Sequence, residues 1–69
     1  MDRSVAELLM KDMLAMSEPL NSITILCERI GDTEERKTFR RGVGQLMDKL
    51  YADLMLPIIR QYPDLDPDN

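Results

Sequence analysis

The residue types that carry out chemistry are sparse in this sequence, and histidine is absent altogether. The single cysteine, Cys27, could be a nucleophile, but a catalytic thiol needs a neighbouring base and an electropositive opening. Without histidine, both the commonest base and the commonest metal ligand are missing. Cys27 also lies on a periodic apolar row, so we interpret it as a buried structural thiol. The sequence therefore predicts no catalytic residue, no metal site and no cofactor, and we expect a protein that is not an enzyme.

Two further patterns match ligand-binding motifs only in part. The Gly-Val-Gly of residues 42–44 lies inside a helical pattern and lacks the strand that precedes a phosphate-binding loop. Asp64, Asp66 and Asp68 alternate like the first ligands of a calcium loop, but no glycine or bidentate glutamate follows them. We interpret these aspartates as a solvated acidic tail, and they account for three of the four net negative charges of the chain.

A basic cluster is the remaining candidate site, and it consists of Arg36, Lys37, Arg40 and Arg41. Like charges four residues apart on a helix repel one another, and positive charge near a helix N-terminus opposes the helix dipole. Nearby acidic side chains, solvent or an anionic partner must compensate. We interpret the cluster as a solvated, salt-bridged face and keep partner or anion binding as the alternative.

The elements that would position these residues follow from the apolar spacing. One row advances by alternating steps of three and four, which is typical of a heptad seam on a helix: Ala6, Leu9, Met13, Met16, Leu20, Ile23, Cys27 and Ile30. A second stripe is broader: Phe39, Val43, Leu46, Met47, Leu50, Leu54 and Ile58. Ser4 with Glu7 predicts a capping box at the first helix start, and Asp32 with Glu35 predicts one at the second. The sequence thus predicts helices over 4–30 and 33–62, with a turn at 31–32 in which Gly31 can adopt positive φ.

Pro19 and Pro57 fall inside these predicted helices. Each removes one backbone hydrogen bond and clashes with the preceding turn. Because the heptad register passes through Pro19 without a phase shift, we favour kinks near residues 19 and 57 in nearly continuous helices. The alternative is a three-helix arrangement in which the chain breaks near Pro19 and a short N-terminal helix folds back.

Sixty-nine residues predict one domain, a helical hairpin over 1–62 followed by an acidic Pro/Asp tail over 63–69. A lone pair of such helices leaves much of both stripes in water, so we predict an all-α fold in which two hairpins dimerise into a four-helix bundle. The candidate dimer core comprises Leu9, Met13, Met16, Leu20, Ile23, Cys27, Ile30, Phe39, Val43, Leu46, Leu50 and Leu54. Of the methionines outside the seam, we expect Met10 and Met55 to be exposed.

The architecture resembles that of the plasmid repressor-of-primer family. The shared features are a short chain, one tight turn with an aspartate, the pair Leu50-Tyr51 in the second helix and an acidic C-terminal tail. The resemblance implies a dimer of hairpins, and it carries over no RNA-contacting residue. In an antiparallel dimer, the acidic tail of one copy would approach the basic cluster of the other.

The expected function is binding of another protein, as a regulator or adaptor. The alternative is RNA binding through the basic cluster at the hairpin tip. One cysteine is compatible with a reducing compartment, and no apolar run is long enough to span a bilayer, so we expect a cytoplasmic protein without a membrane partner. The balance of 9 basic and 13 acidic residues does not favour nucleic-acid binding.

Overall fold

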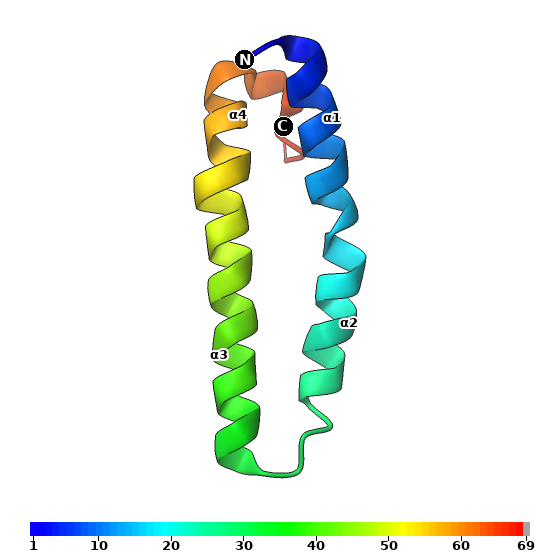
Figure 1. Ribbon diagram of the computed structural model, residues 1–69, viewed down its shortest axis with the longest axis vertical. Helices are drawn as coiled ribbons and strands as arrows, with labels where there is room; N and C mark the ends of the chain where they lie inside the picture. The colour runs from blue at the N-terminus through cyan, green and yellow to red at the C-terminus, as the bar shows by residue number, and fades with distance from the viewer. Residues whose placement is uncertain (69) are drawn as a thin grey trace.

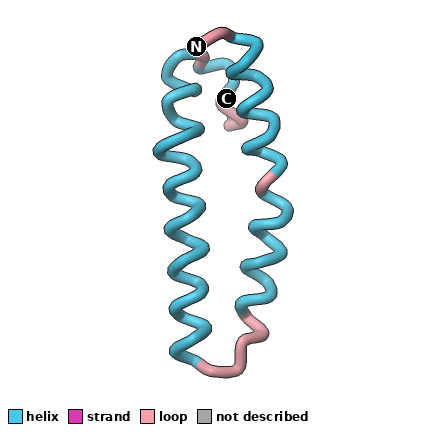
Figure 2. The backbone as a smooth tube through the Cα atoms, viewed as in Figure 1, coloured by secondary structure: helices cyan, strands magenta, loops and turns pink. Residues whose placement is uncertain are grey.

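The computed structural model describes residues 1–68, and every regular element within them is helical. The elements are α1 (Arg3–Ala15), α2 (Ser17–Cys27), α3 (Thr33–Lys49), the π-helical turn η1 (Leu50–Met55), α4 (Leu56–Gln61) and the short 3-10 helix η2 (Pro63–Leu65). Figures 1 and 2 show two long limbs side by side, one made of α1 and α2 and the other of α3, η1 and α4. The molecule measures 46 × 19 × 17 Å. The predicted all-α helical hairpin is confirmed. Among the described residues, no helix combines the length and apolarity needed to cross a membrane.

The turn between the limbs is defined by Asp32, which caps α3. Its side chain accepts a hydrogen bond from the backbone N–H of Glu35 at 3.3 Å, as the capping box predicts. The first limb ends earlier than predicted, at Cys27, because the next three N–H groups bond three residues back and tighten the last turn. Gly31 does not adopt positive φ. The connection is therefore residues 28–32 rather than a two-residue reversal.

The start of α1 also differs from the prediction. Asp2 precedes the helix and accepts the first helical bond from Ala6 N–H at 3.0 Å, but no side chain caps this end. Ser4 lies inside the helix, so its predicted capping box with Glu7 is wrong. Glu7 instead pairs with Arg3, one helical turn before it, at 3.0 Å.

Pro19 interrupts the first limb by a single residue. Met16 separates α1 from α2, and its N–H bonds to Met13 three residues back at 3.1 Å. The hydroxyl of Ser17 donates to the Leu14 carbonyl at 2.8 Å, which satisfies an acceptor near the missing proline N–H. Because α2 continues along the limb that α1 begins, the three-helix alternative with a folded-back segment is not adopted (Figure 1).

Pro57 acts differently, because the helix widens before it instead of breaking. Residues 50–55 form a π turn, and the N–H of Leu56 bonds to the carbonyl of Tyr51, five residues back. Pro57 then lies in the first turn of α4, where its missing N–H costs least. A π turn holds one extra residue, so the apolar stripe of this limb shifts by one position beyond it. The limb ends at Gln61 because Tyr62 precedes a proline and is driven out of helical geometry, at φ −134° and ψ 80°.

The buried core lies at the end of the hairpin that carries both chain termini. It comprises Ala6, Met10, Met13, Met55 and Ile58, with Leu50, Ile59, Tyr62 and Leu65 packed against it. The prediction that Met10 and Met55 are exposed is therefore wrong. The 3-10 helix η2 brings Leu65 back onto this core, so residues 63–65 are attached to the hairpin and do not form the loose start of a tail that their composition suggests.

Candidate interaction surface

The heptad seam of the first limb divides into two rows with different burial. Ala6, Met13, Leu20 and Cys27 are spaced seven residues apart, and all four are at most 9% exposed. The intervening row, Leu9, Met16 and Ile23, is 40–43% exposed. A step of three residues turns the side chain about 60° around the helix, so the single facing limb covers one row and leaves the other open.

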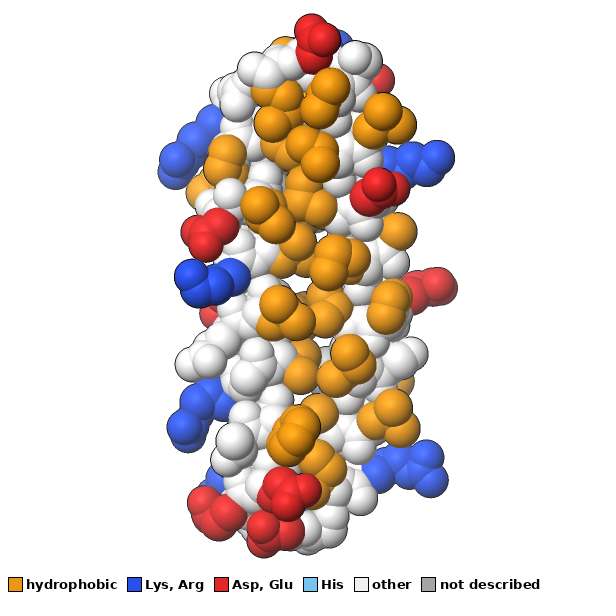
Figure 3. All heavy atoms as spheres, in the orientation of Figure 1, with side chains coloured by type: hydrophobic (Ala, Val, Ile, Leu, Met, Phe, Trp, Pro, Cys, Tyr) orange, Lys and Arg blue, Asp and Glu red, His pale blue; other side chains and the backbone are white. Residues whose placement is uncertain are grey.

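The second limb repeats this division. Val43 and Leu50 are half-buried against the first limb, whereas Phe39, Leu46 and Leu54 are 49–55% exposed. Phe39 and Leu46 are seven residues apart and Leu54 follows after eight, because the π turn adds a residue. We call the six exposed residues the apolar stripe: Leu9, Met16, Ile23, Phe39, Leu46 and Leu54. Figure 3 shows such a stripe along the hairpin, with charged side chains mainly at its flanks.

Two shallow hollows lie along the stripe, on either side of Leu46. The Gly42 hollow, of about 410 Å³, is lined by Ile23, Thr38, Phe39, Gly42, Val43 and Leu46. The Leu50 hollow, of about 360 Å³, is lined mainly by Met13, Met16, Leu46, Leu50, Asp53 and Leu54. A Cβ added at Gly42 would meet no atom within 4 Å. The absence of a side chain at Gly42 is therefore not required by close packing of the turn around Pro19.

Cys27 lies on the buried row and is 4% exposed. It lines a small hollow of about 150 Å³ together with Thr24, Arg40, Val43, Gly44 and Met47. Arg40, the cation that lines this hollow, is already paired with Glu28 at 3.1 Å. Within residues 1–68, no group of three or more potential ligating side chains converges to hold a metal ion. These surroundings are those of a packed thiol.

Most of the basic cluster has acceptors within the chain. Arg36 donates to the carbonyl of Ile30 at 3.2 Å, and Arg40 pairs with Glu28 across the turn. Lys37 lies 4.0 Å from Glu34, a loose and exposed pair. The cluster thus lies along the first part of α3 with one close ion pair, at Arg40, and its role in binding a partner or anion stays a prediction.

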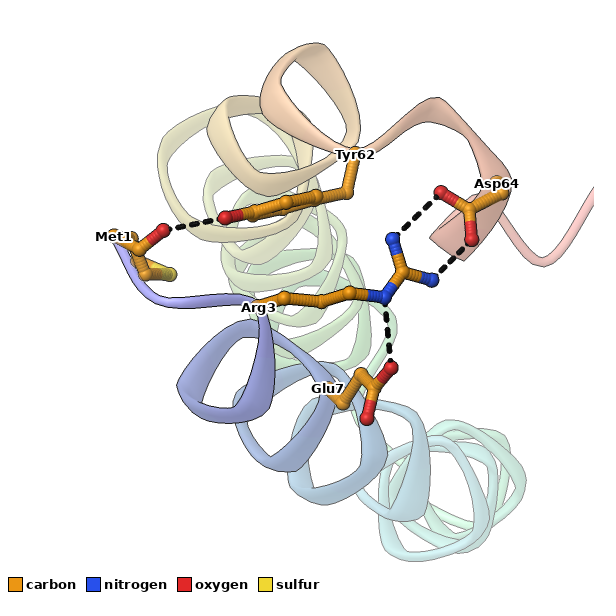
Figure 4. A network of polar contacts seen from close by, with 5 residues as sticks. All are labelled: Met1, Arg3, Glu7, Tyr62 and Asp64. Carbon is orange, nitrogen blue, oxygen red and sulfur yellow. Dashed lines mark hydrogen bonds and ion pairs between the residues drawn. The ribbon is translucent and has the colours of Figure 1, made fainter.

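The two chain ends are joined by a group of contacts that the sequence did not predict, which we call the terminal clasp (Figure 4). The guanidinium of Arg3 makes a bidentate ion pair with Asp64, one bond of which, Nη1 to Oδ1, measures 3.2 Å. Its Nε donates to Glu7, and the group lies 5.4 Å from the ring centre of Tyr62. The Tyr62 hydroxyl donates to the carbonyl of Met1 at 2.6 Å. The clasp holds η2 against the start of α1.

The clasp changes the chemistry expected of the acidic tail. The hydrogen bonds from Arg3 hold the pKa of the Asp64 carboxyl below its usual range, and the carboxylate in turn raises the pKa of Arg3. Asp64 is thus paired with Arg3 of its own chain, and the approach of the acidic tail to the basic cluster of a partner copy stays a prediction. The pair could not be predicted from apolar periodicity, because periodicity does not relate an arginine near one end of the chain to an aspartate near the other.

Comparisons with protein-family models, with curated proteins and with solved structures found no match for this chain. The likeness to the repressor-of-primer family therefore rests on the architecture and on the few residues quoted for it.

Proposed function

We propose that this hairpin is a non-enzymatic interaction protein that dimerises through its apolar stripe into a four-helix bundle. The observation that supports this is the row of six large apolar side chains, each at least 40% exposed, that runs the length of one face. Monomeric soluble proteins rarely leave so long a contiguous apolar surface in water. A second hairpin, which carries the same stripe, covers it by the symmetric pairing that is commonest among homodimers.

The free energy available from burial of the apolar stripe is of the same order as the cost of forming a dimer. Full burial of a leucine, isoleucine, methionine or phenylalanine contributes about 1.5–3 kcal/mol, so each half-exposed residue of the stripe has about 1 kcal/mol still to gain. With six such residues in each copy, the gross gain is on the order of 10 kcal/mol per dimer. Association costs about 4–15 kcal/mol, so a stable dimer needs the good packing that the hollows allow.

As a dimer, the protein would act as a regulator or adaptor that binds another protein. Apolar side chains outside the stripe remain available for this contact, notably Leu8 at 63% and Ile25 at 67% exposure. They lie on the same limb and are not among the residues that line the two hollows of the stripe. The bundle would therefore bury one face and present another.

Analytical ultracentrifugation tests the proposal directly. We expect a species of twice the 8.0 kDa chain mass, and we expect Leu46→Glu to convert it into a folded monomer. Leu8→Glu is the matched control, because it adds the same charge at an exposed leucine away from the stripe. It should leave the dimer intact and weaken capture of a protein partner. A wild-type monomer would contradict the proposal.

RNA binding through the basic cluster is the second candidate. Arg41 is the member that makes no ion pair or side-chain hydrogen bond within the described residues. Two of the four cations, Lys37 and Arg40, are already paired with carboxylates of the same chain, so less positive charge is free for phosphate, and this candidate ranks below protein binding. Retention on RNA that falls steeply with salt, and that is lost in Arg41→Gln, would favour it.

A further inference from the structure

We infer that the two copies lie antiparallel, with Leu46 of each copy in the Gly42 hollow of the other and Phe39 of each in the other's Leu50 hollow. This inference rests on the dimer proposed above and deepens it, because it assigns the occupant of the stripe, its orientation and its register. The chemistry of the site is apolar, and the occupant is a second copy of this chain.

The charge distribution sets the orientation. Residues 1–15 and 50–68, at the end that carries the termini, include three basic and seven acidic side chains, whereas residues 16–49 include six of each. A parallel dimer would place two ends of net charge −4 beside each other at a helix spacing of about 8–10 Å, which is comparable to the screening length of about 8 Å at physiological salt. An antiparallel dimer places each acidic end beside a neutral one and separates the two acidic ends along a molecule 46 Å long.

The spacing along α3 sets the register. Phe39 and Leu46 are seven residues apart, which is about 10 Å along a helix. The hollows are centred near Gly42 and Leu50, eight residues apart through the π turn, which is a similar distance. When α3 packs antiparallel against α3 of the other copy, a two-fold axis near residue 44 therefore places Leu46 and Phe39 of each copy in the two hollows of the other. This register also covers Phe39, the only phenylalanine of the chain, which is 55% exposed.

The two helical glycines behave as this arrangement requires. A Cβ at Gly42 or at Gly44 would meet nothing within 4 Å, so neither glycine is needed for packing within one hairpin. Glycine nevertheless costs a helix about 1 kcal/mol relative to alanine. Gly42 lines the hollow on the apolar stripe, whereas Gly44 lines the separate hollow beside Cys27. Only Gly42 would keep space open for a leucine of the second copy.

The orientation is tested by a distance between spin labels in the dimer. A Glu34→Cys label in a Cys27→Ala background marks the turn end of each copy, about ten residues from the proposed axis. The antiparallel register separates the two labels by at least about 30 Å, whereas a parallel dimer brings them within about 20 Å. Circular dichroism and sedimentation of the labelled protein check that it is folded and dimeric.

The register is tested by filling each hollow with the same side chain. We expect Gly42→Gln to raise the dimer dissociation constant at least about tenfold, because it overfills an occupied hollow. Gly44→Gln, the matched control, should change the constant less than about twofold, which is typical of a surface site. A monomeric wild type would overturn both the proposed function and this inference. A dimer with a short label distance, or one indifferent to Gly42→Gln, would overturn the inference alone.

Discussion

Replacement of Leu46 by alanine should weaken the dimer far more than it weakens the hairpin. Leu46 is 49% exposed in one chain and lines both hollows of the apolar stripe. Within one hairpin the change removes about half of a leucine's burial, or about 1 kcal/mol, and both residues are good helix formers. In the dimer the second half is lost as well, and a cavity is left in each copy.

The expected magnitude follows from these two contributions. Lost burial and the cavity together cost about 1–2 kcal/mol per copy, which is about 2–4 kcal/mol per dimer. The dissociation constant should therefore rise about 30- to 1,000-fold. Sedimentation equilibrium over a range of protein concentrations measures this change directly, and thermal unfolding at low and high concentration provides an independent reading.

Ile58→Ala is the control for a purely intrachain effect. Ile58 is 2% exposed and belongs to the core at the terminal end. Its truncation should lower the free energy of unfolding by about 2–5 kcal/mol and leave the dissociation constant of folded chains nearly unchanged. If Leu46→Ala shifted neither the dissociation constant nor the melting temperature, the assignment of Leu46 to a buried dimer face would be refuted.

Three further predictions concern substitutions at single positions outside the apolar stripe. Asp32→Ala should lower the free energy of unfolding by about 1 kcal/mol because it removes the cap of α3, whereas Asp2→Ala, which removes no cap bond, should change it little in denaturant titrations. Gly44→Ala should raise stability by about 1 kcal/mol and the melting temperature by about 4–8 °C, because its Cβ meets open space; a lower melting temperature would reveal a contact there. Arg3→Gln should raise the pKa of Asp64 toward its ordinary value in a carboxyl NMR titration. Because the folded pKa of Asp64 is lowered, the clasp stabilises the fold above the ordinary carboxyl pKa and is lost as the pH falls through the lowered value, so the variant should lose this acid-dependent step.

The sequence alone determined the elements of this protein. Apolar steps of three and four identify two helices, and the aspartate before the second helix marks its start, because capping and periodicity are local properties of the chain. The prolines marked the two irregular points, since a missing N–H disturbs any helix that contains it. How each irregularity is resolved was not readable. Pro19 is accompanied by a one-residue interruption at Met16, and Pro57 is preceded by a π turn over Leu50–Met55.

The tertiary structure decided which row of apolar residues on each helix is buried within the hairpin. A heptad pattern identifies the apolar side of a helix but not how many other helices pack against that side. Leu20 and Ile23 are therefore equivalent in the sequence pattern, yet in one hairpin they are 5% and 43% exposed. Contacts between the chain ends were equally invisible, because the pairing of Arg3 with Asp64 depends on where the hairpin brings them. Composition predicted a loose acidic tail, but the fold places η2 over the core and lets Leu65 pack there. Local patterns identify helices and their faces, whereas burial and pairing depend on which surfaces the folded chain brings together.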